Sequence, residues 1–218
     1  MRHLEQPMDQ ETLAALDTML PFVPRFGWTR RALEEGLRAS GRDAGEALFH
    51  FPGGAPEMVE AFFEASLARA LAAAGPQVAC EVRLSKKVRA LVAAFLQALG
   101  AHREAARRAC GWLMLPGQVP HATRIAARIV DAIWEAAGDA SEDIAWYTKR
   151  ASLGAILLPT LLFWLSEPEG TEETVLAFFE RRLRGIGRIG RLRARLKSGC
   201  GGLRGRRFHP SAAPETAG

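Results

Sequence analysis

Apolar residues recur along the chain with the 3.6-residue period of amphipathic helices. In a first expected helix, residues 9–20, the side chains of Leu13, Leu16 and Leu20 fall on one face. No segment alternates β-branched with polar residues, which is the pattern of a half-buried strand. The pattern therefore predicts an all-α fold of nine to ten helices.

Glycine, proline and capping residues predict where these helices begin and end. Pro21 and Pro24 are expected to limit the first helix, and Thr29 and Asp43 to cap the second and the third. Gly75-Pro76 is expected to end the fourth helix, and Pro116-Gly117 the sixth. The most apolar run, residues 151–165, contains Pro159 and is shorter than the roughly 20 residues of a bilayer span, so it predicts a buried core helix. The expected helices cover about residues 9–20, 29–40, 43–50, 56–74, 85–99, a segment ending near 115, 120–137, 141–165 and a last one from 171.

The first three expected helices are short, with a tight turn at residues 40–42, and look like a helix-turn-helix unit. This layout is similar to tetracycline-repressor-like regulators, in which larger helices follow and enclose a ligand. DNA reading needs donors to base edges and cations for phosphates, but the candidate recognition segment, residues 43–50, has two acids and no Lys or Arg. Four arginines between residues 30 and 42 leave weak phosphate contact open. We expect no nucleic-acid partner.

The charge of the chain is unevenly distributed. Residues 1–180 hold 18 Lys/Arg and 23 Asp/Glu, a net charge of −5, whereas residues 181–207 hold 11 Lys/Arg and no acid. An acidic body with a basic tail indicates that the tail alone contacts an anionic surface, either a membrane or a nucleic acid.

Cysteine usage and the N-terminal residues bear on the compartment. Cys80, Cys110 and Cys200 are too few and too scattered for a disulfide framework or a zinc site, which fits a reducing compartment. The first residues contain no apolar signal core, and their early acids disfavour a mitochondrial transit peptide. Because Arg outnumbers Lys 25 to 4, which is typical of GC-rich genomes, we expect a bacterial cytoplasmic protein.

We find no catalytic constellation in the sequence and expect no enzyme, no metal and no cofactor. Asp131, Glu135 and Asp139 recur every four residues, but no His lies at metal-ligand spacing beside them. They are interpreted as a solvated acidic face, open to a basic partner. His102 and His121 have no companion nucleophile in a recognisable motif.

Residues 131–165 carry the most specific motif. A helix that ends in Gly-Asp and a Ser cap precede Asp-x-x-Trp-Tyr-Thr-Lys-Arg at residues 143–150. This block closely resembles the ubiquinone-biosynthesis accessory ("Coq-nine") family, which has a tetracycline-repressor-like fold. Supporting matches are Phe-Gly-Trp-Thr at 26–29, Phe-Pro-Gly-Gly at 51–54 and Phe-Phe-Glu-Arg-Arg-Leu at 178–183. The chain departs from the family at residues 166–168, Ser-Glu-Pro, where an Asp-Ser pair is usual.

The resemblance implies a non-catalytic protein whose ligand is a phospholipid or an isoprenoid quinone. Family members bind this lipid in the helical domain, associate with a membrane through a C-terminal amphipathic helix, and present a ubiquinone intermediate to a di-iron hydroxylase. A homodimer is also expected. The family's partner-binding patch maps here onto Asp143, Trp146 and Tyr147, to which we add the neighbouring Arg150.

Helical geometry limits how the two aromatic residues of this patch can be placed. Trp146 and Tyr147 are adjacent and therefore about 100° apart on a helix, so both can hardly face the core. Either one large aromatic is exposed beside the basic residues, as at a binding hot spot, or Trp146 is buried with Tyr147 at the rim.

Apolar stripes offer candidate lipid-binding residues on two helices. Leu153, Leu157, Leu161 and Trp164 share about one face of the helix over residues 141–165, and the preceding helix carries a matching isoleucine stripe. Simple core packing is the alternative for every one of them. The predicted lipid-binding residues are Leu96, Leu113, Ile129, Ile133, Leu153, Leu157, Leu161 and Trp164.

The basic tail also shows helical periodicity. Its apolar residues fall within roughly a 120° arc with arginines mostly opposite, which is typical of a helix lying in a membrane interface. Seven glycines between residues 185 and 205 make it a poor helix in water, so it is expected to fold on the membrane. A disordered arginine-rich arm for nucleic acid is the alternative. The predicted membrane-binding residues are Ile186, Ile189, Leu192, Arg195, Leu196 and Leu203.

Together these observations predict a division of the chain and a function. A helix-turn-helix-like module (1–54) precedes a lipid- and partner-binding domain (55–184), a membrane-binding helix (185–207) and a disordered tail (208–218). The predicted function is a lipid-binding accessory factor of ubiquinone biosynthesis, peripheral on the inner face of the bacterial inner membrane, or on the matrix side in a mitochondrion. The alternative is a ligand-responsive regulator that binds DNA.

Overall fold

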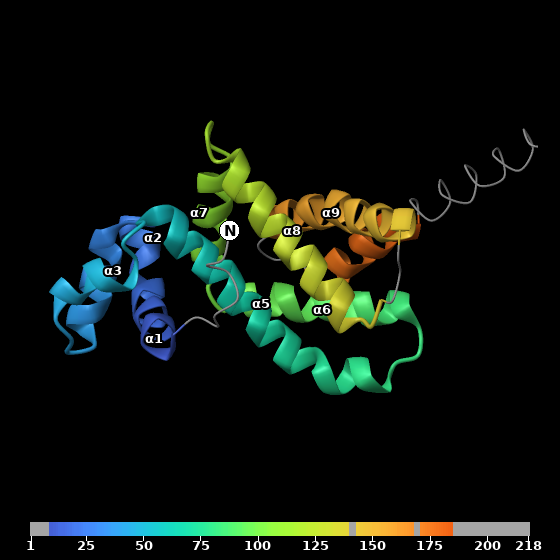
Figure 1. Ribbon diagram of the computed structural model, residues 1–218, viewed down its shortest axis with the longest axis horizontal. Coiled ribbons are helices and arrows are strands. Elements are labelled where there is room, and N and C mark those ends of the chain that lie inside the picture. The colour runs from blue at the N-terminus through green and yellow to red at the C-terminus, as the bar shows by residue number, and fades with distance from the viewer. Residues whose placement is uncertain (1–8, 140–142, 168–170, 185–218) are drawn as a thin grey trace, which may run out of the picture.

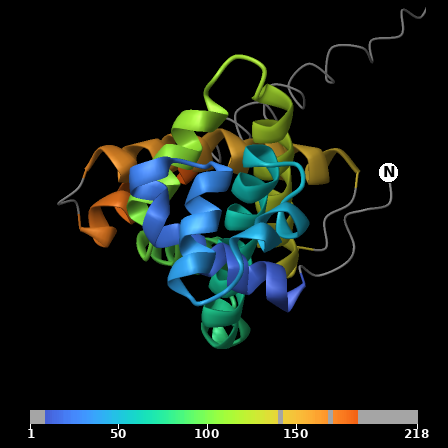
Figure 2. The same cartoon turned by 90° about the vertical axis from the view of Figure 1, so that its left-hand side faces the viewer.

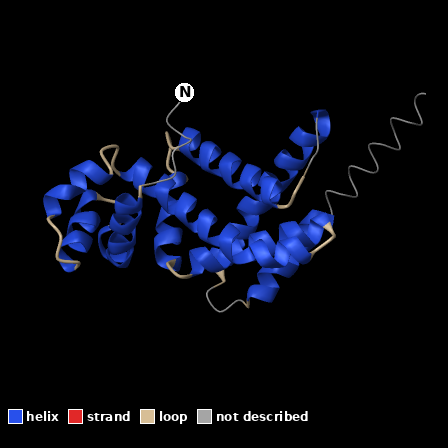
Figure 3. Ribbon diagram, turned by 60° about the horizontal axis from the view of Figure 1, so that its bottom comes forward, coloured by secondary structure: helices blue, strands red, loops and turns tan. Residues whose placement is uncertain are grey.

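The computed structural model describes residues 9–139, 143–167 and 171–184, and the side chains of residues 143–145 lie outside that description. Every regular element within these ranges is a helix (Figures 1 and 3), which confirms the predicted all-α class. The predicted membrane-binding residues from Ile186 to Leu203, the tail 208–218 and the Ser141 cap lie outside the described residues.

The N-terminal module, seen face-on in Figure 2, is built from short helices. Pro21 and Pro24 were expected to limit the first helix, yet each occupies the first turn of another short element. A proline there costs no hydrogen bond, because the first N–H groups of a helix have no partner within it. The elements are α1 (Gln10–Met19), the 3₁₀ turn η1 (Leu20–Phe22), α2 (Val23–Phe26), α3 (Arg30–Ala39), the 3₁₀ turn η2 (Ala44–Glu46) and α4 (Ala47–His50).

Two predicted caps can be compared with the structure in this module. Asp43 accepts a hydrogen bond from the backbone N–H of Gly45 at 3.0 Å, as an N-cap residue does. Thr29 stands at the N-cap position of α3, but its hydroxyl donates to the carbonyl of Phe26 at 3.0 Å instead of accepting from the helix. Its capping role was therefore wrongly predicted.

Trp28 joins the module to the rest of the fold. Its buried indole N–H donates to the carbonyl of Ala105 at 3.2 Å, and its ring lies 5.2 Å from that of Phe62. On the surface, Arg69 donates to both carboxylate oxygens of Asp17 at 2.6 and 2.8 Å. The module is thus held against α5 and α7 by one buried and one exposed polar contact.

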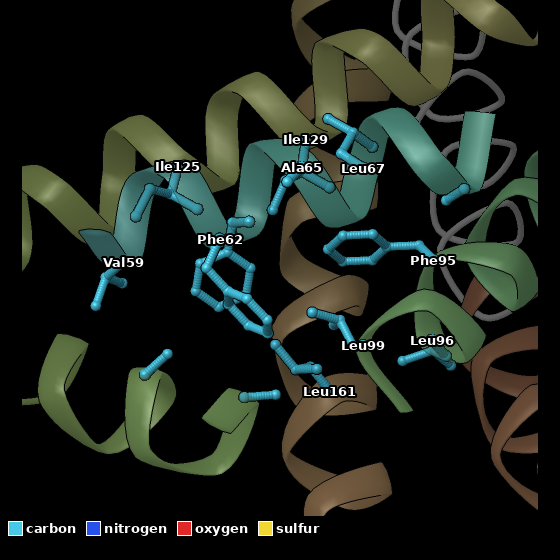
Figure 4. Close-up of a cluster of buried hydrophobic side chains, with 14 of the residues drawn as sticks. Val59, Phe62, Ala65, Leu67, Phe95, Leu96, Leu99, Ile125, Ile129 and Leu161 are labelled. Atoms are coloured by element: carbon cyan, nitrogen blue, oxygen red, sulfur yellow. The ribbon is translucent and has the colours of Figure 1, made fainter. Parts of the chain in front are cut away.

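Longer helices form the body of the protein. Helix α5 packs along α6 and against α8, and α8 packs against α9. Figure 4 shows Ile129 of α8 beside Ala65 and Leu67 of α5, and Ile125 of α8 near Val59 and Phe62, in the buried core. The helices are α5 (Ala55–Cys80), α6 (Leu84–Gly100), α7 (Arg103–Leu113), α8 (Val119–Ala136), α9 (Asp143–Ser166) and the helical residues 172–184.

Helix α5 corrects one predicted boundary. Gly75-Pro76 was expected to stop it, but the helix continues to Cys80. Ala70, Ala74 and Val78 continue one buried stripe across the proline, so the packing of this last turn against the core offsets the cost of the missing hydrogen bond. Helix α9 likewise continues past Pro159 to Ser166.

A helix that crosses a membrane must be both long and apolar. Within residues 9–139, 143–167 and 171–184, no helix combines the length and the apolar character that crossing a membrane requires.

Candidate functional site

An apolar hollow lies between α8 and α9. It has a volume of about 610 Å³. Three further helices contribute to its lining through Phe63 of α5, Phe95 of α6 and Cys110 of α7. Small residues line it on both long walls, namely Ala122, Ala126 and Ala127 on α8 and Ala151 and Gly154 on α9. Because these side chains are short, the two helices pack together without filling the space between them.

The cavity follows α9 for much of its length. Its α9 wall begins at Trp146 and ends at Leu162, a distance of about 24 Å at 1.5 Å per helical residue. A Cβ atom added to Gly154 would lie 3.8 Å from the Val130 side chain of α8, which is ordinary van der Waals contact. The wall around Leu157 and Leu161 is apolar, whereas the opposite end carries charged groups.

Arg150 and Asp131 form that polar end. The guanidinium Nε of Arg150 donates to Asp131 Oδ1 at 2.5 Å, and its carbon lies 3.7 Å from the centroid of the Trp146 ring. The Arg150 side chain is 17 % exposed, and its Nη1 is buried with no hydrogen-bond acceptor among the described residues. This end therefore combines a neutral ion pair with one unsatisfied donor.

The adjacent aromatic pair divides between the cavity and the surface. Tyr147 is 71 % exposed, and Trp146 is half-buried and lines the cavity. The two rings meet edge to face with their centroids 4.8 Å apart. The tyrosine is thus the exposed aromatic, while Asp143 begins α9 and its side chain lies outside the description.

The eight predicted lipid-binding residues divide into two groups. Those that line the cavity are Leu113, Ile129, Leu157 and Leu161. The other four are buried away from its wall and pack in the core, namely Leu96, Ile133, Leu153 and Trp164. The periodicity of each helix marked its buried face, and only the packing between helices shows which part of that face borders the cavity.

Several wall residues were missed from the sequence. Phe63, Phe95 and Cys110 reach the cavity from helices distant in sequence, and no local pattern connects them. Ala151 and Gly154 had a usable signal, because small residues at i and i+3 beside a leucine stripe leave room on a helix face.

The acidic series on and after α8 is paired within the chain. It was interpreted as a solvated face, but Asp131 pairs with Arg150, and Asp139 accepts from the Lys149 ammonium at 2.5 Å. Glu135 is exposed. Two of the three carboxylates therefore hold α9 in place, and no group of three potential metal ligands occurs among the described residues.

Burial changes the acid–base behaviour of two groups in the body. Desolvation raises the pKa of the Cys110 thiol to about 12, so at neutral pH it is an inert apolar part of the cavity wall. Burial also lowers the pKa of His102, which stands at the N-cap position of α7 without a capping hydrogen bond and does not line the cavity.

The rim of the cavity is apolar and open to solvent. Met114, Leu158 and Leu162 line the cavity and are also exposed, and exposed Leu115 and Val119 continue this surface into the α7–α8 connection. Three exposed large apolar residues of the described surface thus lie on the cavity wall, and two more follow Met114 within five positions along the chain.

Comparison with known sequences shows which proteins these helices resemble. The family model described as COQ9 matches residues 119–190, which include all of α8 and α9. The ubiquinone biosynthesis protein COQ9-A of Xenopus laevis, described as mitochondrial, is 30% identical over 185 residues. The chain is thus similar to COQ9 proteins across α8 and α9 and over most of its own length.

The alignments cover most of this chain but only part of each COQ9 protein. The Xenopus laevis alignment covers 82% of this chain and 57% of the relative. The human mitochondrial COQ9 is 30% identical over 193 residues, covering 84% of this chain and 59% of the relative. The chain therefore spans a little under three fifths of the length of these COQ9 proteins.

A solved structure confirms the predicted fold. A TetR transcriptional regulator from Nitrosomonas europaea superposes with a TM-score of 0.63 over 82% of this chain and 99% of that chain. Its sequence identity of 22% makes the likeness one of fold alone. This chain thus has the tetracycline-repressor-like architecture predicted from its sequence.

Proposed function

We propose that this chain is a non-catalytic accessory protein of ubiquinone biosynthesis that binds an isoprenoid or quinone intermediate and presents it to a hydroxylase at a membrane. Similarity to COQ9 proteins, whose names place them in ubiquinone biosynthesis, supports the pathway. The single structural observation that carries the ligand is the cavity between α8 and α9, because its apolar wall suits a water-insoluble molecule.

The dimensions of the cavity fit a lipid chain. Its volume of about 610 Å³ lies within the range of sites for small molecules, and the wall runs for about 24 Å beside α9. The cavity is open at a rim that includes Met114, Leu158 and Leu162. A lipid that enters there crosses an apolar surface and does not have to pass charged side chains.

The ligand is proposed to be presented to the hydroxylase at the end of the cavity that carries Trp146. This ring forms part of the cavity wall, and the exposed Tyr147 touches it from outside. Large aromatics with one face free are typical anchors of protein interfaces. A hydroxylase bound to this pair would therefore lie directly beside one end of the ligand.

The charges of the cavity support binding over catalysis. The Asp131 and Arg150 side chains are already paired with each other, and the raised pKa of Cys110 keeps its thiol from acting as a nucleophile. The chain's own contribution is then to hold the ligand and keep water from its chain, while the partner supplies the chemistry.

The contact with a membrane is proposed for the basic segment that follows the described helices. Residues 181–207 carry 11 Lys/Arg and no acid, and anionic headgroups attract each such cation by about 1 kcal/mol. The bound lipid would then be exchanged at the bilayer surface.

The helix-turn-helix module offers little support for a DNA-binding function. Arg42 pairs with Glu46 at 2.6 Å and contacts His50 Nε2 at 3.0 Å, and Arg38 pairs with Glu35 at 2.9 Å. These arginines are thus committed to neighbouring side chains, and phosphate binding would have to displace those contacts.

A cavity-filling substitution tests the proposal. Gly154→Leu places a side chain inside the cavity, and Gly111→Leu makes the same change on an exposed face of α7 with no heavy atom within 4 Å of its new Cβ. Native mass spectra with lipid extraction should show a prenylated quinone or phospholipid on the unchanged protein and on Gly111→Leu. Gly154→Leu should carry at least about tenfold less, because the added volume excludes the ligand.

The contrary outcomes are equally clear. Retention of the same lipid by Gly154→Leu would place the ligand elsewhere. An unchanged protein that carries no lipid but retains a duplex promoter fragment would favour the regulator.

A further inference from the structure

One end of the cavity holds a donor that the protein leaves unsatisfied. Arg150 gives its Nε–H to Asp131, while its Nη1 is buried and meets no acceptor among the described residues. Buried donors in folded proteins nearly always have a partner, and an exception at a cavity wall is explained when a ligand supplies the acceptor. Arg150 also lines the wall between α8 and α9, so its guanidinium lies beside the space that a ligand would occupy.

The other polar groups of the wall do not compete for a ligand's head. The hydroxyl of Thr123 donates to the carbonyl of Val119 at 2.8 Å, and burial keeps the Cys110 thiol neutral. Asp131 is the acceptor that Arg150 already uses. Of the two charged groups of the wall, Arg150 is therefore the one that retains a donor able to orient a long ligand in the cavity.

The charge of this end limits the ligand's chemistry. The carboxylate of Asp131 neutralises the guanidinium at 2.5 Å, and the negative face of the Trp146 ring lies 3.7 Å from the guanidinium carbon. An anionic head placed here would approach a pair whose charges already cancel, with the Asp131 carboxylate 50 % exposed, and would gain no net attraction. A neutral oxygen satisfies the free N–H without changing the net charge.

Resting on the proposed function, we infer that the Asp131–Arg150 end of the cavity is a headgroup subsite for a lipid with a neutral oxygen acceptor. Arg150 Nη1 donates to a carbonyl, ether or hydroxyl oxygen of the head, and the chain extends along the wall toward Leu157 and Leu161. The subsite selects against anionic heads, and it holds the oxygenated head beside Trp146 and the exposed Tyr147.

Three probes with 20-carbon isoprenoid chains test this subsite on the full chain by native mass-spectrometric titration. Geranylgeranyl acetate offers a neutral carbonyl oxygen, geranylgeranyl diphosphate offers an anion, and the hydrocarbon phytane offers no acceptor. The unchanged protein should bind the acetate about tenfold more tightly than the other two, as expected for one hydrogen bond from a charged group.

Variants assign the preference to the ion pair. Arg150→Gln should weaken acetate binding about tenfold and leave phytane binding unchanged. Arg150→Lys keeps the charge but loses the planar set of guanidinium donors, so its acetate affinity should lie between those of the unchanged protein and Arg150→Gln. Arg124→Gln removes a cation from α8 outside the cavity wall and should change neither acetate nor phytane binding. Asp131→Asn should raise diphosphate affinity by about tenfold, because it frees the guanidinium charge.

The outcomes separate this inference from the function on which it rests. If no probe binds the unchanged protein, the lipid-binding function itself fails and the subsite with it. If all three bind with equal affinity, or if Arg150→Gln weakens phytane as much as acetate, the cavity binds lipid but the headgroup subsite is wrong. Preference for the diphosphate over the acetate would overturn the selection of neutral heads. Thermal unfolding of each variant shows whether a loss reflects misfolding.

Discussion

Small residues do opposite things in the N-terminal module and in the body. In the module, Gly36 of α3 lies so close to α1 that an added Cβ would come within 2.5 Å of the Thr18 carbonyl oxygen. In the body, Gly154 of α9 leaves 3.8 Å between such a Cβ and Val130 of α8. One glycine brings two helices into contact, and the other leaves a cavity between them.

The difference arises from the larger residues that surround each glycine. In the module, Leu16, Met19, Leu33 and Leu37 are fully buried and draw α1 and α3 together. Along α8 and α9 the small residues line the cavity on both sides. Some bulky residues of its lining, such as Phe63, come from other helices. A small residue therefore indicates close packing only where large neighbours complete the contact.

The cysteines give the largest expected effect and test whether the cavity wall is dry. In a Cys200→Ser background, a thiol reagent at pH 8 should modify buried Cys110 at least about 10³-fold more slowly than exposed Cys80. The pKa of Cys110 is raised to about 12, so its rate should rise about tenfold per pH unit until the pH nears that value. Comparable rates at pH 8 would show that water enters the wall freely.

Gly36→Ala tests the close contact in the module. Despite the better helix propensity of alanine, the substitution should lower the free energy of unfolding by about 1–3 kcal/mol, because the new Cβ overlaps the Thr18 backbone. The matched change Gly111→Ala meets no neighbouring atom within 4 Å and should stabilise by up to about 1 kcal/mol. Urea unfolding followed by circular dichroism measures both, and equal effects would contradict the close approach.

Trp28→Phe tests how firmly the module is held against the body. Loss of the hydrogen bond to the Ala105 carbonyl and of part of the buried ring should cost about 1–2 kcal/mol. Hydrogen exchange should become faster in residues 10–50 than in α5 and α6, since the contact lies at their junction. Uniform acceleration along the chain would instead make the two regions one cooperative unit.

Asp17→Asn gives the smallest expected effect. The pair with Arg69 is partly exposed at both partners, so its loss should cost at most about 1 kcal/mol, and less in 1 M salt. Glu34→Gln, which alters an exposed pair within α3, is the control. A cost above 2 kcal/mol would mean that the ion pair, and not Trp28, is the main contact between module and body.

Much of this protein follows from its sequence alone. Helical periodicity predicted the all-α class, and the Trp-Tyr-Thr-Lys-Arg block at 146–150 predicted the similarity to COQ9 proteins. The same periodicity failed at Pro76, where packing with α6 outweighed a strong local stop signal. Local chemistry thus determines which element forms, while distant contacts decide how far it extends.

The cavity was decided only in the tertiary structure. Leu153 and Leu157 lie one turn apart on the same apolar stripe, yet the first packs in the core and the second lines the cavity. Asp131 likewise belongs to an acidic series in sequence, and only the approach of α9 makes it the partner of Arg150. A helix's own period specifies its buried face, but empty space depends on which side chains meet across two helices, and that is a property of their packing.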